Sequence, residues 1–207
     1  PDSRRLYVPF GKEPLGGWLV AVDTQRAEVA SAFSATASSG EMVGGMWASG
    51  GPSVDANGGI YIATGSSYNN TKAGMGLAGV YPDSDRNWGQ SILKLVDGEK
   101  GLALSGTYTP FNYCQAGSVD IDLGSSGTVL IDAAPRETTT FRLLFLGGAK
   151  QGNAYLLDRM KMPGSLTRRA SCSTDSETDR SLLAPQAQPQ FGRRGPLSVF
   201  GPYSETE

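Results

Sequence analysis

The segment SGGPSVDANGGIYIATG (residues 49–65) decides the fold, because a second segment of the chain can be laid over it. That second segment is SSGTVLIDAAPRETTTFRLLFLGG (residues 125–148). Each has a Ser-Gly turn, a short apolar run that ends in Asp, a connecting turn, and a β-like run that ends in Gly. Short apolar runs bounded by Gly, Asp and Ser are typical of β-strands. The pair therefore predicts a strand-turn-strand unit that occurs at least twice.

The neighbouring segments extend this repeat to three copies. Gly-terminated strands are expected at 5–11, 58–65 and 141–148, and each precedes a strand that runs into Asp, at 16–33, 90–110 and 152–165. Long loops are expected at 66–88 and 111–121. No helical 3.6-residue pattern accompanies these strands, so the pattern is typical of a β-propeller or a sandwich, and the repetition favours the propeller.

We therefore predict an all-β fold: blades of four antiparallel strands that form an incomplete propeller with long loops. The blades are expected over residues 1–165. The polar, Ser/Thr-rich stretch 166–190 is interpreted as a loop or linker, and residues 191–207 as an extended C-terminal segment. With 28 glycines among 207 residues the chain is rich in tight turns, which also favours short strands over helices.

Charge and composition exclude several classes of function. A net charge of −2 offers no basic face for nucleic acid. No apolar run approaches the roughly 18 residues of a membrane span. The sequence has no histidine, which excludes Ser-His-Asp and Cys-His nucleophiles and histidine-ligated zinc or copper. Any catalysis would depend on carboxylates, Lys, Tyr, a hard metal ion or a cofactor.

Four segments resemble one known family. GGWLVAVDTQ, GGMWASGGPSVDANGGIYIATG, DLGSSGTVLI and GGAKQGNAYLLDRMKMPG together are similar to the pyrroloquinoline-quinone-like (quinoprotein-type) β-propellers. A blade of that family carries a G-x-L-x-A-L-D strand before a polar turn and a G-x-x-Y-x-x-x-G strand, and residues 17–23, 59–65 and 152–158 fit these patterns. The resemblance covers residues 5–165 and implies seven or eight blades in the whole propeller, of which this chain supplies only part.

The resemblance implies two functions of different classes. One is a non-enzymatic, secreted or otherwise extracytoplasmic propeller module that binds proteins or a ligand within a larger assembly, with no cofactor. Its partners are then other protein subunits or the missing blades of the same propeller. The alternative is a fragment of a quinone-dependent alcohol or sugar dehydrogenase. Such enzymes use pyrroloquinoline quinone with calcium, a tryptophan floor and in many members a vicinal disulfide, and this sequence has no adjacent cysteines.

Two acidic residues form a candidate metal site. Asp120 and Asp122 alternate along an extended segment, so both carboxylates would point to one side. Together with the Ser125 hydroxyl they offer oxygen ligands of the kind that calcium prefers. The alternative is that they cap the turn before the following strand. No further acidic ligand follows, because the chain continues directly into TVLI.

Other residues have both a structural and a functional interpretation. Trp47 lies in a glycine-rich approach to a strand, where it either packs between blades or stacks on a cofactor or sugar ring. Asp23 and Asp158 are expected to cap polar turns. Gly148, Lys150 and Gly152 suggest a phosphate-binding loop, but a β-like run follows, which favours a hairpin turn.

Two expectations concern covalent modification. Cys114 and Cys172 either stay reduced or, in an oxidising compartment, form a disulfide whose long loop would contribute roughly 4 kcal/mol. Asn69 begins an Asn-Asn-Thr sequence that matches the pattern for N-glycosylation.

Overall fold

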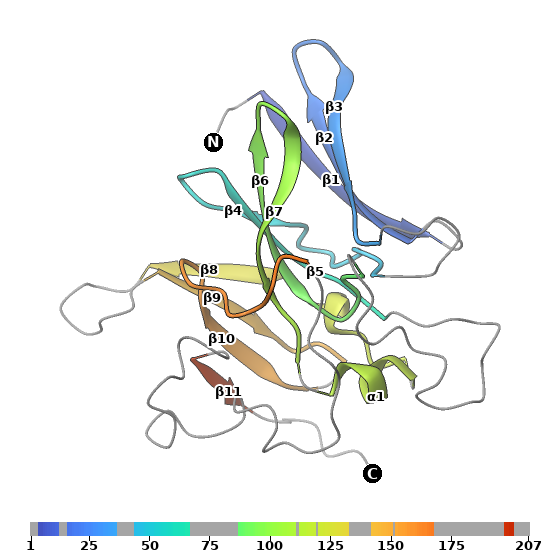
Figure 1. Ribbon diagram of the computed structural model, residues 1–207, viewed down its shortest axis with the longest axis vertical. Coiled ribbons are helices and arrows are strands. Elements are labelled where there is room, and N and C mark those ends of the chain that lie inside the picture. The colour runs from blue at the N-terminus through green and yellow to red at the C-terminus, as the bar shows by residue number, and fades with distance from the viewer. Residues whose placement is uncertain are drawn as a thin grey trace.

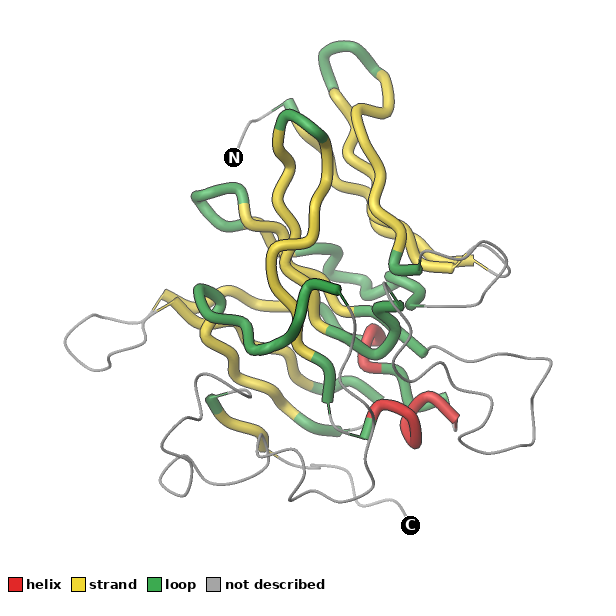
Figure 2. The backbone as a smooth tube through the Cα atoms, in the orientation of Figure 1, coloured by secondary structure: helices red, strands yellow, loops and turns green. Residues whose placement is uncertain are grey.

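The computed structural model describes residues 4–12, 16–36, 44–66, 87–110, 112–118, 120–132, 142–150, 152–167 and 197–200. These residues form an all-β structure of three antiparallel sheets (Figure 1). Figure 2 shows how little of this part of the chain is helical. The predicted fold class is confirmed, and the sheets do not close into a ring.

The first sheet has the order β1-β2-β3, with β1 at Arg5–Lys12, β2 at Gly16–Asp23 and β3 at Glu28–Ser34. The middle sheet has the order β4-β5-β6-β7, with β4 at Ser53–Val54, β5 at Gly59–Ala63, β6 at Ile92–Gly98 and β7 at Gly101–Tyr108. The third sheet is β8 (Thr128–Asp132), β9 (Arg142–Gly147), β10 (Ala154–Asp158) and β11 (Ser198–Phe200). The helix α1 (Tyr113–Ser118) and a 3-10 turn, η3 (Leu123–Ser125), connect β7 to β8.

The two segments that predicted the repeat form equivalent strand pairs. β4 and β5 are the first two strands of the middle sheet, and β8 and β9 are the first two of the third sheet. The expected four strands per blade are present in these two sheets. The first sheet differs, because it has three strands among the described residues.

Two other details differ from the sequence-based expectation. The strand that follows β10 in its sheet is not the segment directly after Asp158 but β11, some forty residues later, within the stretch predicted as an extended C-terminal segment. The expected loop 111–121 contains α1, whose Tyr113 and Ala116 are buried three positions apart. One short helical turn is enough to bury both side chains.

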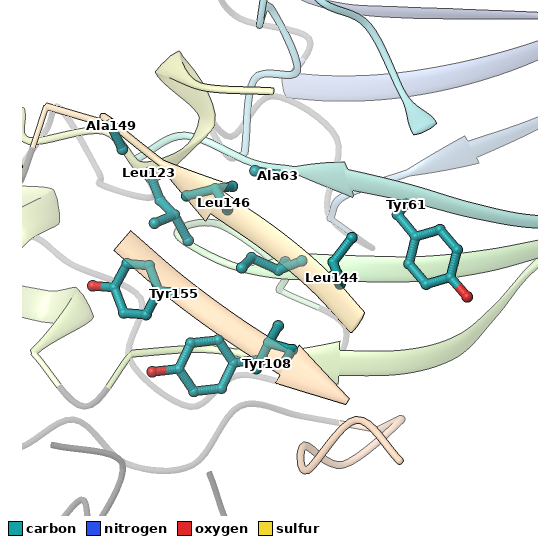
Figure 3. Close-up of a cluster of buried hydrophobic side chains, with 10 residues drawn as sticks. Tyr61, Ala63, Tyr108, Leu123, Leu144, Leu146, Ala149 and Tyr155 are labelled. Carbon is teal, nitrogen blue, oxygen red and sulfur yellow. The ribbon is translucent and has the colours of Figure 1, made fainter. Parts of the chain in front are cut away.

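The middle sheet lies between the other two (Figure 1). On one side Ile60, Ile62 and Leu93 pack in a buried cluster with Leu19 of the first sheet. On the other side Tyr61, Ala63 and Tyr108 pack with Leu144, Leu146 and Tyr155 of the third sheet (Figure 3). Successive residues of β5 thus face opposite neighbours, as the two-residue period of a strand requires. Face-to-face packing of this kind is how propeller blades bury their sheets.

Polar contacts also connect the sheets. Arg5 of β1 donates to Asp23 in its own sheet at 2.9 Å and to Asp97 of β6 at 3.1 Å. Thr128 of β8 donates from Oγ1 to the backbone oxygen of Tyr61 at 3.0 Å. These bonds set the position of each sheet against the middle one.

The outward-facing sides of the first and third sheets are apolar. On the outer face of the first sheet the register pairs Leu6 with Val22, Val8 with Val20 and Phe10 with Trp18. Leu6, Val8 and Phe10 are 53%, 38% and 43% exposed. The outer face of the third sheet carries Val129, Ile131, Leu143, Phe145 and Leu156.

Candidate functional site

The candidate site lies where β5 and β9 end and where the chain approaches β4 and β8. Gly44 donates to the backbone oxygen of Ser66 at 2.8 Å, and Gly65 donates to that of Gly45 at 2.9 Å. The approach to β4 therefore lies beside the end of β5. Gly124 in η3 fits directly on the same backbone, because a Cβ atom at Gly124 would lie 2.5 Å from the nitrogen of Gly65.

The indole ring of Trp47 packs against two glycines, Gly45 and Gly65. A Cβ atom on Gly65 would lie 2.1 Å from Cη2 of Trp47, and one on Gly45 would lie 2.6 Å from its Cζ3. Glycine at both positions makes room for the indole, which is still 47% exposed. The ring is therefore held against backbone while part of its surface stays open to solvent. Trp88, in contrast, is buried in the core between the first and middle sheets.

Asp122 lies next to Trp47 and is almost fully buried. The Cβ position on Gly65 that meets Trp47 is 3.0 Å from Oδ1 of Asp122, and this oxygen accepts the N–H of Ser66 at 2.6 Å. The side chain caps nothing in its own turn η3. The interpretation of Asp122 as a local turn cap is therefore wrong, because its carboxylate binds a strand end 56 residues away in the sequence.

Lys150 brings Asp120 and Asp122 together. Its ammonium nitrogen lies 2.5 Å from Oδ2 of Asp122, 3.1 Å from Oδ2 of Asp120 and 2.9 Å from the backbone oxygen of Asp120. These hydrogen bonds, first to Asp122 and then to Asp120, outweigh burial and raise the pKa of Lys150 above its usual value. The side chain of Asp120 is 72% exposed, whereas that of Asp122 is 3% exposed.

Ser125 positions the backbone of this cluster. Its hydroxyl donates to the backbone oxygen of Asp122 at 2.9 Å and accepts the backbone N–H of Lys150 at 3.1 Å. Lys150 lies within a turn in which Gly152 donates to the backbone oxygen of Ala149 at 2.8 Å, and the strand β10 comes next. The hairpin-turn interpretation of this segment is confirmed, because the phosphate-loop alternative requires a helix there.

Gln90 contributes to the site but has no signal in the sequence. Its backbone has a φ of 53°, a conformation that is uncommon outside glycine. Its side-chain amide donates to the backbone oxygen of Ile121 at 2.8 Å and accepts the N–H of Leu123 at 2.8 Å. Gln90 thereby connects the middle sheet to the segment that carries Asp122, and a lone Gln in a glycine-rich stretch does not predict this role.

A second polar cluster lies at the other end of β5. Asp55 accepts hydrogen bonds from the N–H groups of Asn57 and Gly59, each at 2.9 Å, and from the Tyr61 hydroxyl at 2.8 Å. Burial opposes ionisation of Asp55, but the bonds from Gly59, Tyr61 and Asn57 and the nearby Arg159 outweigh it, so its pKa is lowered. Burial and then the bond to Asp55 raise the pKa of Tyr61.

Arg159 is the cation of this second cluster. It is 2% exposed and donates to Asp132 at 2.6 Å and to the backbone oxygen of Leu143 at 3.1 Å. Its Nε lies 3.7 Å from Oδ2 of Asp55. The cluster joins the middle and third sheets, so its role is to hold the two blades together.

Several predicted features lie outside the described residues. These are Asn69, Cys172 and the side chain of Cys114, so the glycosylation and disulfide predictions stay predictions. Among the described residues no three His, Cys, Asp or Glu side chains form a group that could hold a metal ion. The same part of the chain contains no helix long and apolar enough to cross a membrane.

Comparison with known proteins gives a structural likeness only. Neither a family model nor a curated protein matches the sequence. Among solved structures, the quinohemoprotein alcohol dehydrogenase from Comamonas testosteroni is similar, with a TM-score of 0.56 at 15% identity. The match covers 86% of this chain and 31% of that enzyme. It supports a distant quinoprotein-like propeller fold, and the chain spans about a third of the enzyme's length.

Proposed function

We propose that this chain is a non-enzymatic segment of a larger extracytoplasmic β-propeller, and that the outer faces of its first and third sheets bind further blades or subunits. The observation that carries the proposal is that both outer faces are apolar. The middle sheet supports the proposal, because each of its two apolar faces is packed against a neighbouring sheet, as in a propeller.

The exposed side chains supply a driving force for this association. Leu6, Val8 and Phe10 follow one another along one side of β1, and Val129 and Ile131 do the same on β8. Burying the exposed part of each would contribute about 1 kcal/mol. Contiguous apolar patches of this kind on a soluble protein mark interaction sites. The match to only part of a longer propeller also supports this proposal.

Dye binding by a pair of matched variants tests the proposal. Val8→Glu adds a charge to the outer face of the first sheet, whereas Met160→Glu adds one at a side chain that is also exposed but lies in the turn after β10. We expect the wild type to bind the apolar dye anilinonaphthalene sulfonate, Val8→Glu to bind clearly less, and Met160→Glu to bind as the wild type does. Equal dye binding by all three proteins would contradict the proposal.

Trp47 favours a second candidate, a quinone-dependent dehydrogenase fragment. Its partly exposed ring, beside the Asp122 carboxylate that binds Lys150, offers a surface on which a planar ring can stack. The charges of Asp120, Asp122 and Lys150 match those of the quinone poorly. Pyrroloquinoline quinone is a tricarboxylate, while the two carboxylates and one ammonium here sum to −1, and three oxygens already surround the Lys150 ammonium.

Binding of the quinone distinguishes the two candidates. Pyrroloquinoline quinone with calcium is added to the wild type, to Trp47→Phe and to a Trp18→Phe control, and bound quinone is measured by absorbance. The non-enzymatic proposal expects no retained quinone and no dye-linked oxidation of alcohols or sugars. Retention by the wild type and the Trp18 control, with loss in Trp47→Phe, would favour the dehydrogenase fragment.

A further inference from the structure

Three oxygen atoms converge on a single nitrogen at the Asp120–Asp122 pair. They are one carboxylate oxygen of each residue and the backbone oxygen of Asp120, at 2.5 to 3.1 Å from Nζ of Lys150. A lysine ammonium has three N–H donors and no acceptor. All three donors are therefore used inside the protein.

The protein holds this ammonium in place from both sides. The backbone nitrogen of Lys150 donates to Ser125 Oγ at 3.1 Å and to the backbone oxygen of Asp122 at 3.3 Å. The carboxylate of Asp122 is held by Ser66 at 2.6 Å. A buried carboxylate is costly unless a positive charge or hydrogen bonds compensate it. The cation is therefore part of the folded structure.

We propose that Lys150 is the resident cation of the Asp120–Asp122 pair, and that the pair binds calcium only after this ammonium has been removed. The oxygens that surround Nζ are the ligand type that calcium takes, with water completing the shell of six to eight. The ammonium occupies the place in which the sequence pattern predicts a metal ion. This inference does not depend on the proposed propeller assembly.

The test compares Lys150→Met with Lys161→Met. Lys161 lies in the exposed turn after β10, so its replacement removes one positive charge elsewhere on the surface. Thermal unfolding is measured with calcium chloride and with sodium chloride at the same ionic strength. We expect Lys150→Met alone to be stabilised by calcium, with Tm raised by about 3 °C when calcium exceeds its Kd roughly tenfold. The wild type and Lys161→Met should show no such difference.

Terbium luminescence gives a second readout. Terbium(III) serves as a calcium substitute, and the indole of Trp47 beside Asp122 serves as the sensitiser. Sensitised emission should rise in Lys150→Met and should be lost again in Lys150→Met with Asp120→Asn. Lys150→Gln keeps a hydrogen-bond donor without the charge, and it is measured in the same way in case the methionine variant does not fold.

Two results would overturn the proposal. One is a wild-type protein that calcium stabilises as strongly as it stabilises Lys150→Met, because the ammonium would then not exclude the metal ion. The other is a folded Lys150→Met or Lys150→Gln protein with neither calcium stabilisation nor terbium emission above that of the wild type.

Discussion

At the scale of single residues, the side chains of Trp47 and Asp122 both pack closely against Gly65. A methyl group there would lie 2.1 Å from the indole and 3.0 Å from the carboxylate. Gly65→Ala should therefore displace Trp47, shift tryptophan emission and cost about 2 kcal/mol of unfolding free energy, as overpacking does. Gly50→Ala is the control, because nothing lies within 4 Å of its Cβ position. Unchanged emission and stability in Gly65→Ala would show that the indole does not pack there.

Asp55 gives a prediction about pH. Its pKa is lowered in the folded protein, so its contribution to stability is present above the pKa of the unfolded chain, near 4, and is lost as the pH falls through the folded value. Asp55→Asn should flatten this loss in urea unfolding between about pH 5 and pH 2. At neutral pH the same change should cost about 1–3 kcal/mol, because the Tyr61 hydroxyl loses its acceptor.

A remaining slope in Asp55→Asn is expected from Asp23. Hydrogen bonds from the backbone of Arg26 and Gln25, with Arg5, lower its pKa against a smaller effect of burial. The result that would contradict the assignment is an acid-induced loss of stability that is the same in the wild type and in Asp55→Asn.

Turn caps and the pairing of Asp120 with Asp122 could be predicted from the sequence, whereas the partners of these two carboxylates could not. Asp23 accepts N–H groups two and three residues later, and Asp158 accepts that of Met160, as expected for Asp before a polar turn. Asp122 binds Ser66 and Lys150, which lie 56 and 28 residues away. Local pattern carries no information on such partners. The sequence singles out Lys150 only as part of a phosphate-loop pattern, and this pattern does not predict that Lys150 binds the two carboxylates.

At the scale of elements, Gln90 connects the middle sheet to η3. Gln90→Ala would leave the N–H of Leu123 and the backbone oxygen of Ile121 without their partner. Each buried unpaired group costs about 1–3 kcal/mol, so we expect a loss of about 3 kcal/mol in urea unfolding. Gln25→Ala, in an exposed turn, is the control. If Gln90→Ala loses no more unfolding free energy than the control does, the hydrogen bonds of Gln90 do not contribute to stability.

Most strands could be predicted from the sequence, because the pattern of their residues repeats. β1, β5 and β9 each end near glycine, and the strand after each runs into Asp. The fourth strand of the third sheet could not be predicted, because β11 is three residues long and lies far from β10 in the sequence. Its pairing with β10 depends on the sheet that is already formed.

At the scale of the whole molecule, the stacking order of the sheets depends on which side of each strand is buried. The β5 segment is apolar on both sides, which is consistent with a sheet covered twice, and all five of its residues are buried. The β1 segment is also largely apolar, yet Leu6, Val8 and Phe10 remain exposed. The sequence pattern alone does not distinguish a face that this chain covers from one that a partner covers.

The central claim is that the three sheets are propeller blades, and that further blades or subunits bind the outer faces of the first and third sheets. The measurement that tests it most directly is the molar mass of the isolated chain by size-exclusion chromatography with light scattering over a range of concentrations. We expect a mass above that of the 21.7 kDa chain that rises with concentration. A mass that stays at that of the monomer, with one cooperative unfolding transition, would contradict it.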